Sequence, residues 1–162
     1  NRNMYFSSVL GCNLGMFYKR RDYTRVVNGR NPIVAHEYLG DSVEGKTVFI
    51  ADDIIASGES MLEVASNLKA RGAKRIIADA TFPLFTSGLE KFDKAVEEGT
   101  LDYVVGTNLT YRKPELLNRD WYVDVDVSKY AAYFIVALNH DMSVSSIIDP
   151  IKKIEALLAN RK

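Results

Sequence analysis

The chain has 162 residues, which is enough for one domain with a hydrophobic core. Its 21 basic and 21 acidic residues give a formal net charge of zero, which argues against a general nucleic-acid or membrane-surface binder. The single cysteine, Cys12, excludes an internal disulfide and fits a reducing compartment. No signal-peptide pattern and no apolar run near the roughly 20 residues of a bilayer-spanning helix are present, so we expect a cytoplasmic protein with no membrane or nucleic-acid partner.

The first elements lead into a basic segment. Hydrophobic spacing predicts a helix over residues 2–10, a short strand over residues 14–18 and another strand over residues 33–39. Residues 19–31 hold five basic residues beside one acid. A solvated loop is the simpler interpretation of such a charge run, although arginine and lysine on a mobile loop also suit phosphoryl transfer.

Residues 47–60 are the most informative stretch. Residues 47–51 predict a buried parallel strand, and Asp52 and Asp53 then follow at its carboxyl end, where α/β proteins bind their ligands. Small residues form the next turn, and a helix is predicted to begin near Ser60. Free N–H groups and the positive dipole at a helix start favour a phosphate group.

Two carboxylates beside such a helix start suit a sugar phosphate. Carboxylates accept hydrogen bonds from vicinal hydroxyls, and the helix start accepts the phosphate. The alternative is an ordinary strand-to-helix turn in which Asp52 or Asp53 caps the helix. We favour the ligand site because a cap needs one acid and this stretch supplies two, together with a turn of small residues.

The remaining pattern predicts alternating strands and helices, with a βαβ unit around the central strand. Residues 81–88 either face the same crevice or form a plain connection, and residues 111–114 either hold an anion or form a solvated turn. Asp120, Asp124 and Asp126 alternate along a predicted strand, so we expect a solvent face and assign no metal ligand. The predicted elements after the central strand are a helix starting near residue 60, strands 75–81, 103–106 and 121–127, and helices 89–98, 129–139 (with Ser128 as N-cap) and one from residue 149.

Residues 48–60 resemble the phosphoribosyl-diphosphate binding loop of type I phosphoribosyltransferases and ribose-phosphate diphosphokinases. From residue 4 to residue 148 the chain resembles the C-terminal half of a ribose-phosphate diphosphokinase, also called phosphoribosyl-diphosphate synthetase. The supporting stretches are Tyr18-Lys19-Arg20-Arg21, Gly45-Lys46-Thr47, Arg71-Gly72-Ala73-Lys74, Thr107-Asn108 and Val144-Ser145-Ser146-Ile147. The resemblance implies that residues 1–162 form a single α/β domain with three layers and a mainly parallel sheet, the type I phosphoribosyltransferase fold.

The resemblance also implies a reaction, the transfer of diphosphate from Mg-ATP to ribose 5-phosphate to give phosphoribosyl diphosphate and AMP. Lys19 and Arg21 match two catalytic cations, and Mg²⁺ accompanies ATP. Much of the adenine and magnesium site of these synthetases precedes this domain and is completed across subunits. We therefore expect a missing N-terminal domain, a homo-oligomer and no turnover by the isolated chain. The residues matching the ribose 5-phosphate site are Asp52, Asp53, Ala56, Ser57, Gly58, Glu59 and Ser60.

Three positions depart from the pattern of the family. Ala56 replaces a frequent aspartate, Glu59 replaces a small residue, and Phe82 replaces a histidine. An added carboxylate at Glu59 is expected to weaken phosphate binding unless it points outward. Two alternatives remain: a phosphoribosyltransferase that consumes phosphoribosyl diphosphate, and a noncatalytic regulatory subunit of a synthetase. Ala56 argues against a purine-specific transferase, because it has no group to accept a proton from the base.

Overall fold

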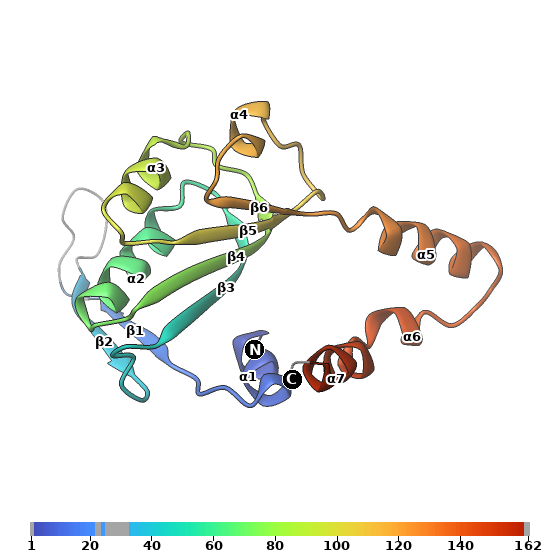
Figure 1. The fold of residues 1–162 in the computed structure, drawn as a ribbon, viewed down its shortest axis with the longest axis horizontal. Coiled ribbons are helices and arrows are strands. Elements are labelled where there is room, and N and C mark those ends of the chain that lie inside the picture. The colour runs from blue at the N-terminus through green and yellow to red at the C-terminus, as the bar shows by residue number, and fades with distance from the viewer. Residues whose placement is uncertain (1, 22–23, 25–32, 161–162) are drawn as a thin grey trace.

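The computed structural model describes residues 2–21, 24 and 33–160 and shows an α/β fold (Figure 1). Its elements in chain order are α1 (Arg2–Leu10), β1 (Met16–Arg21), β2 (Ile33–Leu39), β3 (Thr47–Ile55), α2 (Glu59–Ala70), β4 (Arg75–Pro83), α3 (Glu90–Glu97), β5 (Tyr103–Thr107), α4 (Pro114–Leu117), β6 (Tyr122–Val125), α5 (Ser128–Asn139), α6 (Ser145–Ile148) and α7 (Ile151–Ala159). None of the helices in the described part of the chain is long and apolar enough to cross a membrane.

The central sheet contains four parallel strands in the order β3-β4-β5-β6. Strands β1 and β2 form a separate antiparallel pair. The mainly parallel α/β fold predicted from the sequence is therefore confirmed. In the sheet, Val48 lies beside Ile76 and Val104 lies beside Tyr122, so these four side chains point to one face.

That face is covered by helices and holds the core. Ile76, Ala78 and Ala80 of β4 are completely buried, and they belong to one cluster with residues of α2 and α3. Phe92 of α3 stacks on Trp121 with ring centroids 5.8 Å apart. Each right-handed crossover between neighbouring strands places its helix on this same side (Figure 1).

The opposite face has less cover. Helix α1 lies against β3, where Phe6 packs edge-on against Phe49 with ring centroids 6.4 Å apart. Asn3 Nδ2 also donates to the carbonyl oxygen of Ala51 at 3.4 Å. Helices thus lie on both faces of the sheet. On the second face, however, the contacts of α1 are mainly with strand β3.

The first hairpin differs from the sequence prediction. The strand predicted over residues 14–18 begins at Met16 and continues to Arg21, because pairing with β2 extends it. Lys19 and Arg21 therefore lie on a strand, opposite His36 and Ile33, and not on a loop. Most of the rest of the basic segment lies outside the described residues.

The C-terminal helices leave the sheet after β6. Strand β6 ends at Val125, two residues earlier than predicted, and α5 projects past the edge of the sheet (Figure 1). Ser128 is the first residue of α5, and Val127 occupies the cap position, so the prediction of Ser128 as N-cap was wrong by one residue.

Candidate functional site

The end of strand β3 carries the two predicted carboxylates. The prediction that the strand ends at Ala51 was wrong, because pairing with β4 continues through Asp52 to Ile55. Adjacent residues of a strand point to opposite faces, so Asp52 and Asp53 project from different faces. Both side chains are exposed, and Asp52 Oδ1 accepts a hydrogen bond from the Asp53 amide at 2.8 Å. A ligand that contacts both carboxylates must therefore lie past the carboxyl end of β3, where it can reach side chains from both faces of the sheet.

The loop after β3 leads directly into the start of α2. Gly58 occupies the cap position with φ 79° and contributes no side-chain cap. Ser57 Oγ accepts a long hydrogen bond of 3.5 Å from the Glu59 amide. The first-turn N–H groups of a helix have no partner within the helix, so those of Ser60 and Met61 point to where an anion would bind.

Gly58 packs closely against the Phe92 side chain of the core. A Cβ atom at this position would lie 2.3 Å from the ring of Phe92, and the positive φ also disfavours other residues. Phe92 is completely buried between Phe85, at a centroid distance of 4.9 Å, and Trp121. The start of α2 therefore rests directly on the aromatic core. Sequence reasoning missed Phe92 because no local signal connects two residues so far apart in the chain.

Glu59, one of the three departures, is turned toward α3. Lys91 Nζ donates to Glu59 Oε1 at 2.6 Å, which offsets the negative charge beside the helix start. Both side chains are more than half exposed, so solvent screens this ion pair. Lys91 is a second residue that the sequence analysis did not assign to the site.

The connection between β4 and α3 supports the loop from the side. The amides of Leu84 and Phe85 donate to the Ile55 carbonyl at 2.9 and 3.2 Å, and the Thr86 amide donates to the Ala56 carbonyl at 2.9 Å. Residues 81–88 thus border the candidate site. This agrees with the first of the two interpretations of this segment, in which it faces the same crevice as the loop after β3. Phe82, the third departure, lies on β4 with a partly exposed side chain.

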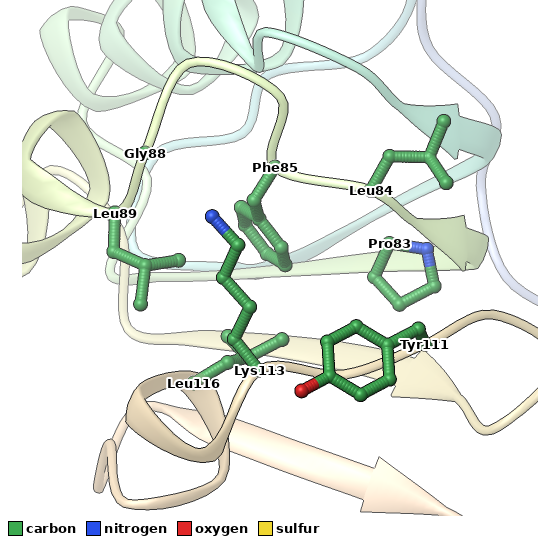
Figure 2. Close-up of a pocket in the computed structure, with 8 residues that line it drawn as sticks. All are labelled: Pro83, Leu84, Phe85, Gly88, Leu89, Tyr111, Lys113 and Leu116. Atoms are coloured by element: carbon green, nitrogen blue, oxygen red, sulfur yellow. The ribbon is translucent and has the colours of Figure 1, made fainter.

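A pocket of about 100 Å³ lies beside this connection (Figure 2). It is mostly apolar, with Tyr111 at its rim, and the Lys113 side chain extends between Leu89 and Phe85. The other side chain of this basic cluster, Arg112, is paired with Asp124. The residues lining the pocket are Pro83, Leu84, Phe85, Gly88, Leu89, Tyr111, Lys113 and Leu116.

The predicted catalytic cations, Lys19 and Arg21, lie on strand β1 of the antiparallel hairpin. The base of their hairpin packs at the opposite edge of the sheet, where Arg71 lies over the Tyr38 ring at 5.3 Å. Arg71 follows the end of α2, which runs back toward the amino ends of the strands. The residues assigned to sugar-phosphate binding, in contrast, are contiguous at the carboxyl edge.

A family model, the phosphoribosyl transferase domain, matches residues 3–130. The chain belongs to this family of phosphoribosyl transferase domains. Within the family it is similar to the domain found in ribose-phosphate pyrophosphokinases, another name for the ribose-phosphate diphosphokinases. The relative from Wolinella succinogenes is 36% identical over 115 residues, which cover 70% of this chain and 34% of the relative. The relative from Thermococcus kodakarensis is 34% identical over 114 residues, which cover 68% of this chain and 38% of the relative.

A solved structure agrees on the fold. The phosphoribosylpyrophosphate synthetase of Mycobacterium smegmatis superposes with a TM-score of 0.64 at 22% identity, covering 86% of this chain and 41% of that one. The chain thus spans between about a third and two fifths of the length of these proteins.

Proposed function

We propose that the chain is the ribose 5-phosphate binding domain of a ribose-phosphate diphosphokinase. The complete enzyme transfers diphosphate from Mg-ATP to the anomeric hydroxyl of ribose 5-phosphate and releases AMP. One observation carries the proposal: α2, whose cap residue Gly58 has no side chain, is separated by three residues from a strand that bears Asp52 and Asp53 near its carboxyl end. The family and the names of the similar proteins support the choice of reaction.

In this proposal the sugar phosphate lies at the carboxyl ends of the strands. The amides from Ala56 to Ser60 hold the 5-phosphate, while Asp52 and Asp53 accept hydrogen bonds from the ribose hydroxyls at the strand end. Holding both ends of the sugar fixes the anomeric hydroxyl in one orientation, which lowers the entropic cost of reaction.

Lys19 and Arg21 have a separate role in the proposal. They neutralise charge on the diphosphoryl group during its transfer, and Mg²⁺ enters bound to ATP. The described residues contain no group of three or more His, Cys, Asp or Glu side chains that could hold a metal ion, and we assign Mg²⁺ no ligand here. The remaining parts of the active site come from a preceding domain and from other subunits, so the isolated chain binds ribose 5-phosphate weakly and releases no AMP.

Calorimetric titration with ribose 5-phosphate tests the binding step. We expect measurable binding by the intact chain and none by the double variant Asp52→Asn, Asp53→Asn. The matched control is Asp120→Asn, because Asp120 is also exposed but precedes β6, whose amino end lies at the other edge of the sheet. Ribose without a phosphate should bind much more weakly if the helix start supplies the phosphate site.

The same protein distinguishes the alternatives. Tighter binding of phosphoribosyl diphosphate with Mg²⁺ than of ribose 5-phosphate would favour a phosphoribosyltransferase. A folded chain that binds neither ligand would favour a noncatalytic subunit. Production of AMP from ATP and ribose 5-phosphate by the isolated chain would contradict the proposal that other parts are required.

A further inference from the structure

Three buried polar atoms near the end of the sheet have no hydrogen-bond partner within the described part of the chain. They are Thr110 Oγ1, Arg112 Nε and Tyr122 Oη. The first two belong to the segment between β5 and α4, which also supplies Tyr111 and Lys113 to the pocket described above. Tyr122 is only 8% exposed. A buried polar group without a hydrogen bond destabilises a fold, so each of these atoms calls for a partner from outside the chain.

The Tyr122 hydroxyl lies beside the Pro83 end of the pocket. A Cβ atom at Gly106 would be 2.5 Å from Tyr122 Oη and 2.8 Å from Pro83 Cγ, so these two atoms flank the same point. Pro83 in turn lines the pocket. Burial raises the pKa of Tyr122 to about 12, and the charge of Asp124 acts in the same direction. The hydroxyl therefore keeps its proton at neutral pH and can donate a hydrogen bond.

The other end of the pocket carries a positive charge. Figure 2 shows Pro83 at one end and Leu89 at the other, with the nitrogen of the Lys113 side chain near the Leu89 end. Between the two ends the walls are apolar and include Phe85 and Leu116. The pocket thus has a cation at one end, a hydrogen-bond donor beside the other, and hydrocarbon surface between them.

This arrangement favours one class of small molecule. The ammonium group attracts an anion, the walls accept a hydrocarbon body, and the phenol needs an acceptor oxygen. At the phenol the charge of Asp124 outweighs that of Arg112, so a neutral carbonyl oxygen fits there better than a second carboxylate. A volume of about 100 Å³ is smaller than the roughly 150 Å³ of a cavity that holds benzene, so the body is limited to a few carbon atoms.

We propose that this pocket binds a small oxo acid, with its carboxylate at Lys113, its hydrocarbon body on the apolar walls and its carbonyl oxygen accepting from Tyr122. Such a ligand supplies the acceptor that the buried hydroxyl lacks. The site is separate from the one proposed for the sugar phosphate, because no residue that lines the pocket belongs to residues 52–60. It therefore does not depend on the proposed function.

Titration with 4-oxopentanoate, followed by tryptophan fluorescence, tests the proposal. Trp121 is the only tryptophan of the chain, and its ring centroid lies 6.0 Å from that of Phe85 and 6.3 Å from that of Tyr122. We expect a dissociation constant of about 1 mM. Two matched compounds should each bind about fivefold more weakly: pentanoate, which lacks the carbonyl, and 2-pentanone, which lacks the anion. Equal affinity for 4-oxopentanoate and pentanoate would overturn the proposal.

Two variants assign the ends of the ligand. Tyr122→Phe removes only the hydroxyl, so it should bind 4-oxopentanoate and pentanoate equally, both with the affinity that the original chain has for pentanoate. Lys113→Met keeps an apolar stem and should weaken binding of both acids while leaving 2-pentanone unchanged. The matched control is Lys74→Met, because Lys74 is exposed at the amino end of β4 and should not affect the site. Circular dichroism establishes that each variant is folded. A preference for the oxo acid that survives Tyr122→Phe would show that the proposal is wrong.

Amide chemical shifts locate the bound probe. We expect the changes caused by 4-oxopentanoate to be concentrated in residues 83–89 and 111–116. Changes concentrated in residues 56–61 would mean that the carboxylate occupies the start of α2, and the proposal would be overturned. These titrations contain no ribose 5-phosphate, so their outcome is independent of whether the loop after β3 binds a sugar phosphate.

Discussion

The two faces of the central sheet differ although they are built from the same strands. On one face Ile76, Ala78 and Ala80 are completely buried beneath helices, whereas on the other Tyr103 and Val123 remain partly exposed. The strand order β3-β4-β5-β6 causes the difference, because every crossover is right-handed and places its helix on the same side. The covered face therefore holds most of the buried apolar side chains, and the opposite, open face is covered in part by α1.

The covered face also sets the geometry of the candidate site. The loop that follows β3 rests on Phe92 through Gly58, and the connection after β4 holds the carbonyls of Ile55 and Ala56. Site and core are therefore joined on this side of the sheet. Substitutions that compare the two faces should show a large effect on one and a small effect on the other.

The largest effect is expected from Phe92→Ala. Removing this buried ring leaves a cavity between Phe85 and Trp121 and should lower the free energy of unfolding by about 4 kcal/mol, as measured by urea denaturation. The control is Phe82→Ala, which removes the same ring from a partly exposed position and should cost about 1 kcal/mol. Equal costs for the two variants would show that the aromatic cluster does not support the fold.

Neighbouring residues of β4 provide a direct comparison of the two faces. Ile76 points to the covered face and is completely buried, while Ile77 points to the open face and is partly exposed. Ile76→Ala should cost about 3 kcal/mol and Ile77→Ala about 1 kcal/mol in urea denaturation of the dilute chain. A reversed order would contradict the assignment of the core to one face.

Gly58→Ala tests the link between the core and the site. The added methyl group meets the Phe92 ring and the backbone has a positive φ, so unfolding free energy should fall by about 2.5 kcal/mol and ribose 5-phosphate binding should weaken. Gly45→Ala is the matched control, because Gly45 has φ 69° with no atom within 4 Å of an added Cβ. It should lose only about 1 kcal/mol from strain and keep its ligand binding. If both variants behave alike, contact with Phe92 does not shape the loop.

Much of this fold could be predicted from local sequence patterns. The alternation of strands and helices and the small-residue turn before α2 depend on residues that are close in the chain, and these predictions agree with the structure. The end of β3 was misplaced at Ala51 because Asp52 and Asp53 lack strand propensity, and pairing with β4 overrides that preference.

What could not be predicted depends on contacts between distant residues. The packing of Gly58 on Phe92 and the ion pair of Glu59 with Lys91 join positions more than 30 residues apart. Lys19 and Arg21 illustrate the same limit, since the basic run alone does not reveal that they pair with β2. Their catalytic role and the assigned sugar-phosphate site remain predictions.

The smallest effect, and the one that depends on pH, concerns Asp93 at the margin of the covered face. Arg119 Nε and Nη2 donate to its two oxygens at 2.8 and 2.9 Å, and Trp121 Nε1 donates to Oδ1 at 2.8 Å. The hydrogen bond from Arg119, with help from Trp121, lowers the pKa of Asp93 against the opposing effect of burial. A lowered pKa in the folded state means that the charged carboxylate stabilises the fold above its unfolded pKa, which is about 3.9.

That stabilisation is lost as the pH falls through the folded pKa. Asp93→Asn should therefore lower the melting temperature by a few degrees at pH 7, and the gap to the original chain should narrow as the pH falls below the unfolded pKa of about 3.9 and the carboxylate becomes protonated. The control Asp120→Asn alters an exposed acid and should leave the melting temperature at pH 7 unchanged. Because Arg119 and Asp93 are each about one third exposed, salt should also reduce the gap at pH 7. If the difference in melting temperature stays constant from neutral to acid pH, the charge of Asp93 does not account for its contribution to stability.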